Sequence, residues 1–417
     1  MRILLLANYY KPEKAASPYL GENKREAFAK AGFDMVLYTP VPTRGVSEEV
    51  RREYRQRLYE EELDGKLKVH RFPLMREGKN PLQRAFRYAL SIWKLYRLAL
   101  KEHDIDILSI GSTPPINGLM FKRIKKKLGC KVVYNLQDMF PDSLVTAGMT
   151  KKGSLIWKLG RKIEDITYRD SDLIVALSED FRRIVLSRGV PEEKVTVIRN
   201  WVDEQAVVDI PRADNTLFDT YGLDREKFYV CYSGNVGLSQ NMDMLLDVAK
   251  SLMDRPDIGF VIVGDGAYKK QVEARVASED LTNVTLLPFQ PYEKISEVFS
   301  LGDCGLIISK AGTGTSSVPS KTWSVMSAAR PVLASFDKGG ELDAIIAESG
   351  CGVCVPANDP EAFRTAVLNM ADDRAARLVM GENGRRYIGK NLTRAIGTAK
   401  WVDVMKSVAQ KTEREED

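Results

Sequence analysis

The chain has 417 residues, more than one ordinary hydrophobic core accommodates, which suits two domains of roughly 200 residues each. With 44% hydrophobic and 29% charged residues, its composition is typical of a globular protein and excludes a disordered one. No apolar run approaches the ~20 residues of a transmembrane helix, and the run at 3–7 is too short for a signal peptide. We therefore expect a cytoplasmic protein.

The net charge of +5 is modest, so its location matters more than its size. Positive residues gather in the first half of the chain, at 82–101, 121–131, 151–162 and 182–188. This distribution indicates an anionic surface next to the N-terminal domain, and we expect no nucleic-acid partner.

The five cysteines are an odd number and lie mostly inside apolar runs, as reduced core thiols do in cytosolic proteins. Cys351 and Cys354 form one Cys-x-x-Cys pair, but neither a second pair nor a nearby histidine completes a zinc site. We therefore expect no bound metal.

Short apolar runs rich in β-formers alternate with helical patterns along the chain. Strands that are apolar on both faces are typical of parallel sheets covered by helices, so the pattern predicts two doubly wound, Rossmann-like α/β domains. The predicted strands lie at 3–7, 35–39, 67–72, 105–110, 131–135, 173–177, 228–233, 259–263, 284–287, 304–308, 331–334 and 352–355.

The segment 82–101 combines an apolar stripe with basic residues. Leu82, Phe86 and Trp93 recur with helical spacing, while arginines and lysines gather on another arc. In one interpretation, the stripe packs on the sheet and the basic arc is solvated. In the other, the helix lies in an anionic membrane interface and attaches the protein peripherally to the inner face of the cell membrane.

Residues 135–143 follow a predicted strand and contain Asp138 beside a turn with a proline. Ligands of α/β domains bind at the carboxyl ends of parallel strands, so this loop is a candidate site. An aspartate at this place is either a helix cap or an acid/base group, and the residues alone leave both roles open.

Between the two sets of strands, residues 203–227 are charged, rich in turns and without periodicity, and we expect the interdomain linker there. This divides the chain into an N-terminal domain, 1–205, and a C-terminal domain, 206–390. The remaining residues, 391–417, predict a terminal helix followed by a charged tail.

The strand at 228–233 continues into a loop, 234–241, with glycines at its start. Gly234 and Gly237 permit a tight turn into the next helix and let backbone N–H groups approach an anion. The alternative is an ordinary strand-to-helix turn, which the spacing alone favours.

Two lysines follow strands of the second domain. Lys310 comes directly after the strand at 304–308, and Lys321 begins a short helix after Pro319 and Ser320. The residues between them are small and rich in hydroxyls, suited to wrapping backbone amides around a sugar or a phosphate. Two lysines beside N–H donors would hold a phosphate, whereas a solvated surface charge is the alternative for each.

The run 319–332, Pro-Ser-Lys-Thr-Trp-Ser-Val-Met-Ser-Ala-Ala-Arg-Pro-Val, resembles the nucleotide-sugar motif of the retaining GT-B glycosyltransferases of family four, or group 1. Residues 134–148, with Asp-x-x-Pro-Asp-Ser, and residues 233–241 resemble the subgroup of O-antigen and lipopolysaccharide fucosamine transferases. The resemblance implies a GT-B fold: two doubly wound Rossmann-like domains facing a central cleft, with a C-terminal helix crossing back to the N-terminal domain.

The resemblance also implies an activity, namely metal-independent transfer of a sugar, expected to be an N-acetylamino sugar, from a UDP-sugar donor with retention. The implied acceptor is a polyprenyl-diphosphate-linked saccharide in cell-surface polysaccharide (O-antigen or capsule) biosynthesis, and no cofactor is needed. In this interpretation Lys310 and Lys321 stabilise the diphosphate, while Asp138, facing the cleft, takes the acceptor proton or orients the donor sugar. The donor-binding positions that carry over are Gly234, Asn235, Gly237, Gln240, Gly264, Phe289, Gln290, Thr313, Gly314, Ser316, Pro319, Ser320 and Ser324.

The chain departs from the family at functional positions. Ser316 and Ser324 stand where the family has glutamates, the second of which usually holds the ribose hydroxyls, and Asn235 and Gln240 replace the Arg and Lys of many members. Two alternatives therefore stay open: a UDP-sugar epimerase of similar fold and a non-catalytic sugar-nucleotide-binding protein. The chain has only two histidines for the acid/base groups that an epimerase needs around the sugar.

Overall fold

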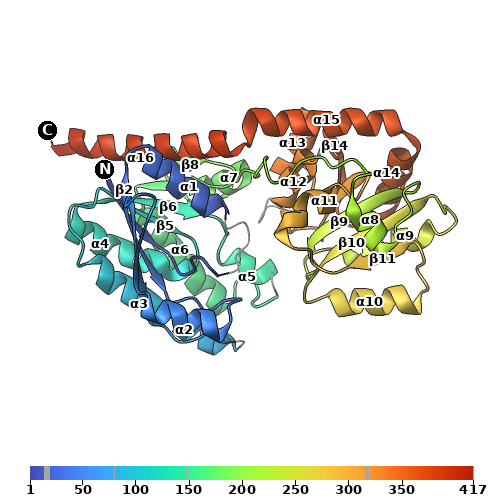
Figure 1. Cartoon of the computed structure of the whole chain (residues 1–417). Coiled ribbons are helices and arrows are strands. Elements are labelled where there is room, and N and C mark those ends of the chain that lie inside the picture. Colours follow the sequence, from blue (N-terminus) through green and yellow to red (C-terminus); the bar gives the residue numbers. More distant parts are fainter. Residues whose placement is uncertain (14–18, 79, 147, 315–318, 417) are drawn as a thin grey trace. The chain divides into compact units, whose positions relative to one another are not determined.

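The computed structural model describes residues 1–13, 19–78, 80–146, 148–314 and 319–416, which form two compact units (Figure 1). The first unit comprises Met1–Arg199 and Gly397–Asp417, and the second comprises Asn200–Ile396. Each has one β-sheet covered by helices. All the strands that the apolar runs predict are present, so the predicted fold of two Rossmann-like α/β domains is confirmed.

The sheet of the first unit has the strand order β3-β4-β2-β1-β5-β6-β7-β8 and is parallel except for β3. The short edge strands β3 and β8 were not predicted by the apolar runs. The strands are β1 Arg2–Leu6, β2 Asp34–Pro40, β3 Tyr59–Glu62, β4 Leu67–Phe72, β5 Ile107–Gly111, β6 Lys131–Leu136, β7 Leu173–Ala176 and β8 Val195–Val197. The helices are α1 Tyr19–Lys30, α2 Glu48–Gln56, α3 Pro81–Ala99, η1 Pro115–Met120, α4 Phe121–Leu128, α5 Asp142–Thr146, α6 Leu155–Asp170, α7 Glu179–Ser187 and η2 Glu192–Lys194.

The last helix, α16 (Arg394–Glu416), returns to the first unit, as the family resemblance implied. Trp401 and Met405 are buried on it, and the Lys24 ammonium of α1 lies 4.3 Å from the centroid of the Trp401 ring. Figure 1 shows α1 and α16 side by side on the sheet. The crossing C-terminal helix is therefore confirmed.

The sheet of the second unit is entirely parallel, with the order β11-β10-β9-β12-β13-β14. Its strands are β9 Phe228–Asn235, β10 Ile258–Asp265, β11 Val284–Leu287, β12 Cys304–Ile308, β13 Val332–Phe336 and β14 Gly352–Pro356. Its helices are α8 Thr216–Tyr221, α9 Met242–Ser251, α10 Lys269–Ser278, η3 Tyr292–Lys294, α11 Ile295–Phe299, α12 Lys321–Ser327, α13 Glu341–Ser349, α14 Pro360–Asp372 and α15 Arg374–Asn391.

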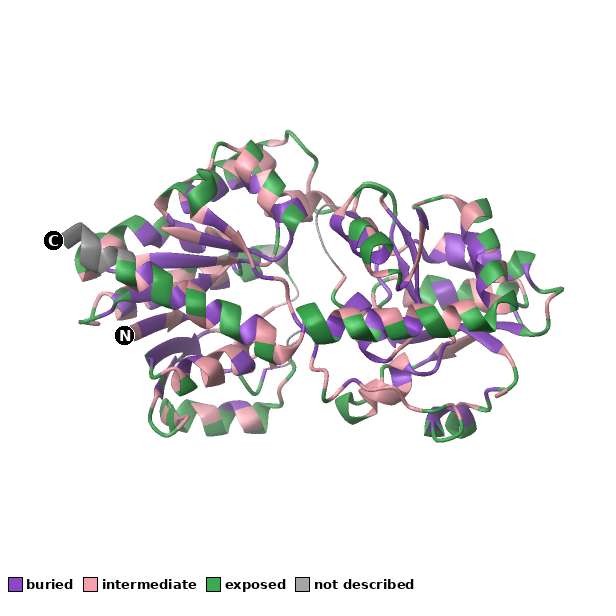
Figure 2. Ribbon diagram, turned by 90° about the horizontal axis from the view of Figure 1, so that it is seen from above, coloured by how far each residue is buried: buried purple, intermediate pink, exposed green. Residues whose placement is uncertain are grey.

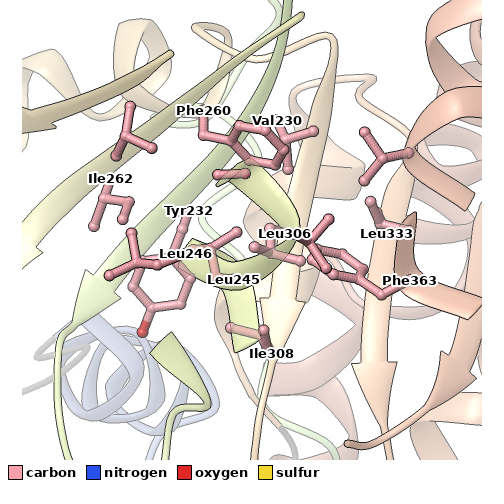
Figure 3. Packing of buried hydrophobic residues seen from close by; sticks show 14 of the residues in the cluster. Val230, Tyr232, Leu245, Leu246, Phe260, Ile262, Leu306, Ile308, Leu333 and Phe363 are labelled. Carbon is pink, nitrogen blue, oxygen red and sulfur yellow. The ribbon is translucent and has the colours of Figure 1, made fainter. Parts of the chain in front are cut away.

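Apolar side chains of this sheet form the core that holds its strand ends in place. Val230, Phe260 and Leu306 from neighbouring strands pack with Leu245 of α9 and Phe363 of α14 (Figure 3). Full burial of side chains of this size stabilises the fold by about 1.5–3 kcal/mol each. In Figure 2 the strands of each sheet are mostly buried, while the outward faces of the helices are exposed.

No helix in the described ranges is both long enough and apolar enough to cross a bilayer. Likewise, no group of three or more His, Cys, Asp and Glu side chains in those ranges could hold a metal ion. The five cysteines are free thiols, and four of them are buried.

The helix α12 ends on a strained residue. Its C-cap is Ala328, and the next residue, Ala329, has a φ of 52°, in the left-handed region that favours glycine. The N–H groups of Ala329 and Arg330 donate to the carbonyls of Met326 and Val325, which closes the turn in the way a glycine usually allows.

We predict that Ala329→Gly stabilises the protein by roughly 0.5–1 kcal/mol, because relief of the left-handed strain outweighs the entropy that glycine adds to the unfolded chain. Urea unfolding followed by circular dichroism measures this difference. Ala328→Gly is the matched control: its φ of −76° carries no strain, so this change should destabilise by about 0.5–1 kcal/mol. Equal effects of the two substitutions would contradict the assignment of strain to Ala329.

Candidate functional site

The candidate site of the second unit lies where the strand order of its sheet reverses. From β9 the chain continues through β10 to β11 on one side and later returns through β12 to β14 on the other. Ligands of open α/β sheets bind at such a switch point, outside the carboxyl ends of the strands. The loops after β9 and β12 meet there, since the Lys310 N–H donates to the Ser239 carbonyl at 2.9 Å.

Lys321 occupies this edge without an anionic partner. Its Nζ lies 3.8 Å from the centroid of the Tyr232 ring, a cation–π contact. Lys321 is partly buried, and desolvation of its ammonium lowers the pKa to about 7. Within the ranges that the structure describes, Lys321 forms no ion pair.

Two residues of β9 place this ammonium. Tyr232, from β9, is fully buried, and its hydroxyl donates to the Asn235 carbonyl at 2.6 Å, which fixes the ring (Figure 3). Gly234 has a φ of 138°, and a Cβ on it would lie only 3.1 Å from the Lys321 Nζ. Glycine therefore leaves the space into which the lysine reaches.

The predicted glycine loop surrounds the same strand end. The Gly237 N–H donates to the Gln240 Oε1 at 3.0 Å, so the glutamine side chain shapes the loop from within. At the end of β10, a Cβ on Gly264 would lie 1.9 Å from the Gly234 carbonyl oxygen, so these two strand ends approach as closely as glycine permits. Gly234, Asn235, Gly237, Gln240 and Gly264 are thus brought together.

The loop after β12 is held by a residue that the sequence pattern did not reveal. The Asp337 carboxylate accepts hydrogen bonds from the N–H groups of Gly312, at 2.9 Å, and Gly314, at 2.7 Å. The Thr313 hydroxyl donates to the Lys310 carbonyl at 2.7 Å. The only signal for Asp337 was its place directly after β13, at the same edge of the sheet.

Lys310 is exposed, and its Nζ lies 6.0 Å from the centroid of the Tyr268 ring. Pro319 and Ser320 precede α12, and the Pro319 carbonyl accepts from the Thr322 N–H at 2.9 Å. Ser324 is one turn beyond Lys321 and partly exposed, so the two side chains lie on the same face of α12. The predicted Ser316 falls outside the described residues.

Phe289 and Gln290 lie farther along the edge, because they follow β11, two strands away from β9. The Phe289 ring is 73% exposed. The Gln290 side chain donates to the Tyr221 hydroxyl and to the Pro288 carbonyl, both at 2.8 Å, and so holds this loop against α8.

In the first unit, Asp138 follows β6 at the carboxyl edge of the sheet and is exposed. The protein around it raises the pKa of its carboxyl through desolvation, while hydrogen bonds from the Ser143 hydroxyl and the Met139 N–H oppose the shift. Its neighbour Asp142 has a structural role, since it accepts from the Trp157 indole at 2.8 Å and pairs with Arg188 at 3.2 Å.

The helix α3 turns its apolar stripe outward. Leu82 is 80%, Phe86 63% and Trp93 51% exposed. The interpretation that this stripe packs on the sheet is therefore wrong for these residues. The residues that α3 buries are instead Arg87, Ser91, Leu95 and Ala99.

Together, two Rossmann-like sheets and a cationic, glycine-lined strand edge in the second define a GT-B-type protein. Residues 214–387 match the family described as Glycosyl transferases group 1, and residues 23–206 match the one described as Glycosyltransferase Family 4. The chain belongs to the group 1 glycosyltransferases of the GT-B fold.

Two curated relatives are also named as glycosyltransferases. The chain is 27% identical to the probable glycosyltransferase WbjE of Pseudomonas aeruginosa over 321 residues, which cover 76% of this chain and 78% of that protein. It is 26% identical to the putative colanic acid biosynthesis glycosyl transferase WcaI of Escherichia coli K12 over 389 residues, 90% of this chain and 95% of WcaI.

Solved structures share the fold. The sucrose-phosphate synthase of Thermosynechococcus elongatus superposes with a TM-score of 0.77 at 14% identity and 98% coverage of both chains. Anabaena Alr3699/HepE in complex with UDP superposes with a TM-score of 0.73 at 14% identity, covering 98% of this chain and 100% of that one. At this identity the likeness establishes the fold alone.

We predict that binding of UDP takes up protons through Lys321. Around pH 8 a lysine with a pKa of about 7 is mostly neutral, and a bound diphosphate would favour its charged form and raise that pKa. Affinity is then full below pH 7 and falls as pH rises above it, by up to about tenfold per pH unit. Calorimetry in buffers of different ionisation enthalpy, at pH 8, should report uptake of about one proton.

Lys321→Gln should abolish this proton uptake and weaken UDP binding, whereas the control Lys310→Gln should retain the uptake because Lys310 is exposed. Equal uptake by the wild-type protein and Lys321→Gln would contradict the assignment.

Proposed function

We propose that this glycosyltransferase moves an N-acetylamino sugar, with retention, from a UDP-sugar to a polyprenyl-diphosphate-linked saccharide in cell-surface polysaccharide biosynthesis. The relative WcaI, named for colanic acid biosynthesis, supports the pathway, and HepE, solved with UDP and with UDP-glucose, supports the nucleotide. The observation that carries the proposal is the Lys321 ammonium, held at the switch point with no ion pair to a carboxylate of the described residues.

In this proposal the departing UDP meets fixed positive charge rather than a metal. Negative charge develops on the diphosphate as the sugar bond breaks, and an ammonium in a desolvated site stabilises that charge better than water does. Lys321 supplies this ammonium from the start of α12, beside the end of β9. The exposed Lys310 supplies a second positive charge from the loop after β12. The tight glycine turns after β9 and β10 leave room for the phosphates beside them.

Asp138 is our candidate for the group that takes the acceptor proton. Its exposed carboxyl has a raised pKa, which makes it a stronger base than an ordinary aspartate. The neighbouring Asp142 is already engaged by Trp157 and Arg188, so it is the poorer candidate.

The exposed apolar stripe of α3 supports peripheral attachment to the inner face of the cell membrane. Leu82, Phe86 and Trp93 face solvent on a helix with basic residues, and the Arg97 guanidinium lies 5.1 Å from the Trp93 ring centroid. Such a helix suits an anionic lipid interface, where an enzyme would meet a lipid-linked acceptor.

The enzyme assay follows UDP release from a panel of UDP-sugars with polyprenyl-diphosphate-linked acceptors. We predict that Asp138→Asn lowers kcat by about 10²–10⁴-fold and leaves the Kd of UDP unchanged, because it removes only the base. Asp165→Asn, which alters an exposed carboxylate of the same unit, is the matched control and should keep full activity. Binding of UDP-sugars without turnover across the panel would favour a non-catalytic binder, and interconversion of the donor sugar would favour an epimerase.

The donor site makes a further prediction at Ser324. If the ribose lies beside the face of α12 that carries Lys321 and Ser324, Ser324→Glu adds a carboxylate that accepts the ribose hydroxyls. UDP should then bind roughly ten- to hundredfold more tightly by calorimetry, as hydrogen bonds to charged groups do. The gain should vanish with 2′,3′-dideoxy-UDP, and a gain that persists with this analogue would contradict the placement of the ribose.

A further inference from the structure

A second surface of the first unit exposes apolar side chains among lysines. Residues 149–162 contain five lysines and arginines and no carboxylate. Met149 is 61%, Leu155 85%, Ile156 62% and Leu159 62% exposed. We call residues 149–162 the α6 surface, since most of them belong to the first half of α6.

The start of α6 exposes apolar residues, although the helix buries the polar Glu164 and Thr167. The buried residues are Gly160, Glu164, Thr167 and Tyr168. Inside the protein, Glu164 pairs with Arg188 and accepts from the Tyr168 hydroxyl at 2.5 Å, so its charge is compensated there. Core packing therefore does not account for the apolar residues at the start of α6, which face outward.

The lysines of this surface are free to meet an external anion. Lys151, Lys152, Lys158 and Lys162 are all exposed, and none of them forms an ion pair within the described part of the chain. On α6, Leu155, Lys158, Leu159 and Lys162 follow the i, i+3, i+4, i+7 spacing of one helix face. Lysines are depleted at the centres of protein interfaces, whereas lysines beside leucines are typical of helices that lie on anionic bilayers.

The α6 surface lies beside both α3 and the loop of Asp138. The 3₁₀ helix η1 packs against both α3 and α6, and its Leu119 is 49% exposed. Figure 1 shows α3, α4 and α6 on the same side of the sheet. On α6, a Cβ on Gly160 would lie 2.8 Å from atoms of Phe140 and Pro141, so the helix touches the loop that carries Asp138.

We propose that the α6 surface is a second membrane contact, which inserts Leu155, Ile156 and Leu159 into a bilayer that contains anionic lipids. The inference rests on the proposed function in one respect, since it takes α3 as the first contact. Two contacts restrict rotation of the first unit on the membrane, where one helix alone would leave it free to roll. Because α6 touches the Asp138 loop, the second contact holds that loop next to the lipid surface, from which a lipid-linked saccharide emerges.

Flotation with vesicles tests the proposal. Vesicles of phosphatidylcholine with phosphatidylglycerol should bind the wild-type protein, in a manner that high salt weakens, and vesicles of phosphatidylcholine alone should bind it poorly. The triple variant Leu155→Ser, Ile156→Ser and Leu159→Ser should bind the anionic vesicles roughly tenfold or more weakly. Its far-ultraviolet circular dichroism spectrum and thermal unfolding should match those of the wild type, which shows that the first unit of the variant folds.

The matched control replaces Leu378 and Val379 of α15, which are 62% and 59% exposed, by serine and should bind as the wild type does. If the triple variant bound the anionic vesicles as tightly as the wild type does, this result would overturn the α6 contact and leave the α3 contact standing. No wild-type binding to either vesicle would overturn both contacts, and UDP affinity and turnover would still test the transferase proposal separately.

Tryptophan quenching separates the two helices. Of the five tryptophans, Trp201, Trp323 and Trp401 are buried, which leaves the exposed Trp93 on α3 and the partly exposed Trp157 on α6 as reporters. In Trp93→Phe, vesicles with brominated phosphatidylglycerol should still quench the remaining accessible fluorescence, because Trp157 lies within the α6 surface. Loss of all lipid quenching in Trp93→Phe, with Trp157→Phe quenched as the wild type is, would overturn the proposal.

Discussion

The candidate site of the second unit depends on an ammonium group that the fold desolvates without pairing it with a carboxylate of the described residues. Lys321 lies against the fully buried Tyr232, and no carboxylate in the described ranges pairs with it. Holding a cation in this way costs free energy, which appears as a pKa lowered to about 7. In our proposal, a bound diphosphate pairs with the ammonium and removes that cost. The free energy recovered in this way strengthens binding of the diphosphate.

The residues around Lys321 leave space beside its ammonium. Because Gly234 and Gly264 have no side chains, the ends of β9 and β10 lie closer together than a Cβ would allow. The Asp337 carboxylate holds the loop after β12 by accepting hydrogen bonds from its backbone N–H groups. Ser324, which stands where the family has a glutamate, adds no negative charge beside Lys321. In our proposal, the interaction with the phosphates therefore contributes more, and the interaction with the ribose less, than in a relative with both carboxylates.

The fold could be predicted well because parallel strands buried on both faces leave long apolar runs, and each run became a strand. The short edge strand β3, Tyr-Glu-Glu-Glu, has no such run and was missed. Lys310, Gly234 and Gly264 were singled out because they stand at or just after the ends of strands, whereas Lys321, the first residue of α12, was singled out by its Pro-Ser-Lys turn and the family resemblance. Tyr232 and Asp337 were not, since their roles arise from contacts between distant segments. The apolar pattern also did not predict which faces of α3 and α6 are buried. Each helix buries a charged residue whose partners come from distant segments: Arg87 donates to the Thr43 hydroxyl, and Glu164 pairs with Arg188.

A structure with UDP bound tests the central claim most directly. In the present structure the Lys321 Nζ lies 3.8 Å from the Tyr232 ring centroid. The account predicts that, with UDP bound, this Nζ lies within about 3 Å of a diphosphate oxygen and the phosphates lie beside Gly234. The account would be contradicted if other groups held the bound diphosphate while Lys321 stayed against Tyr232 and made no contact with the diphosphate.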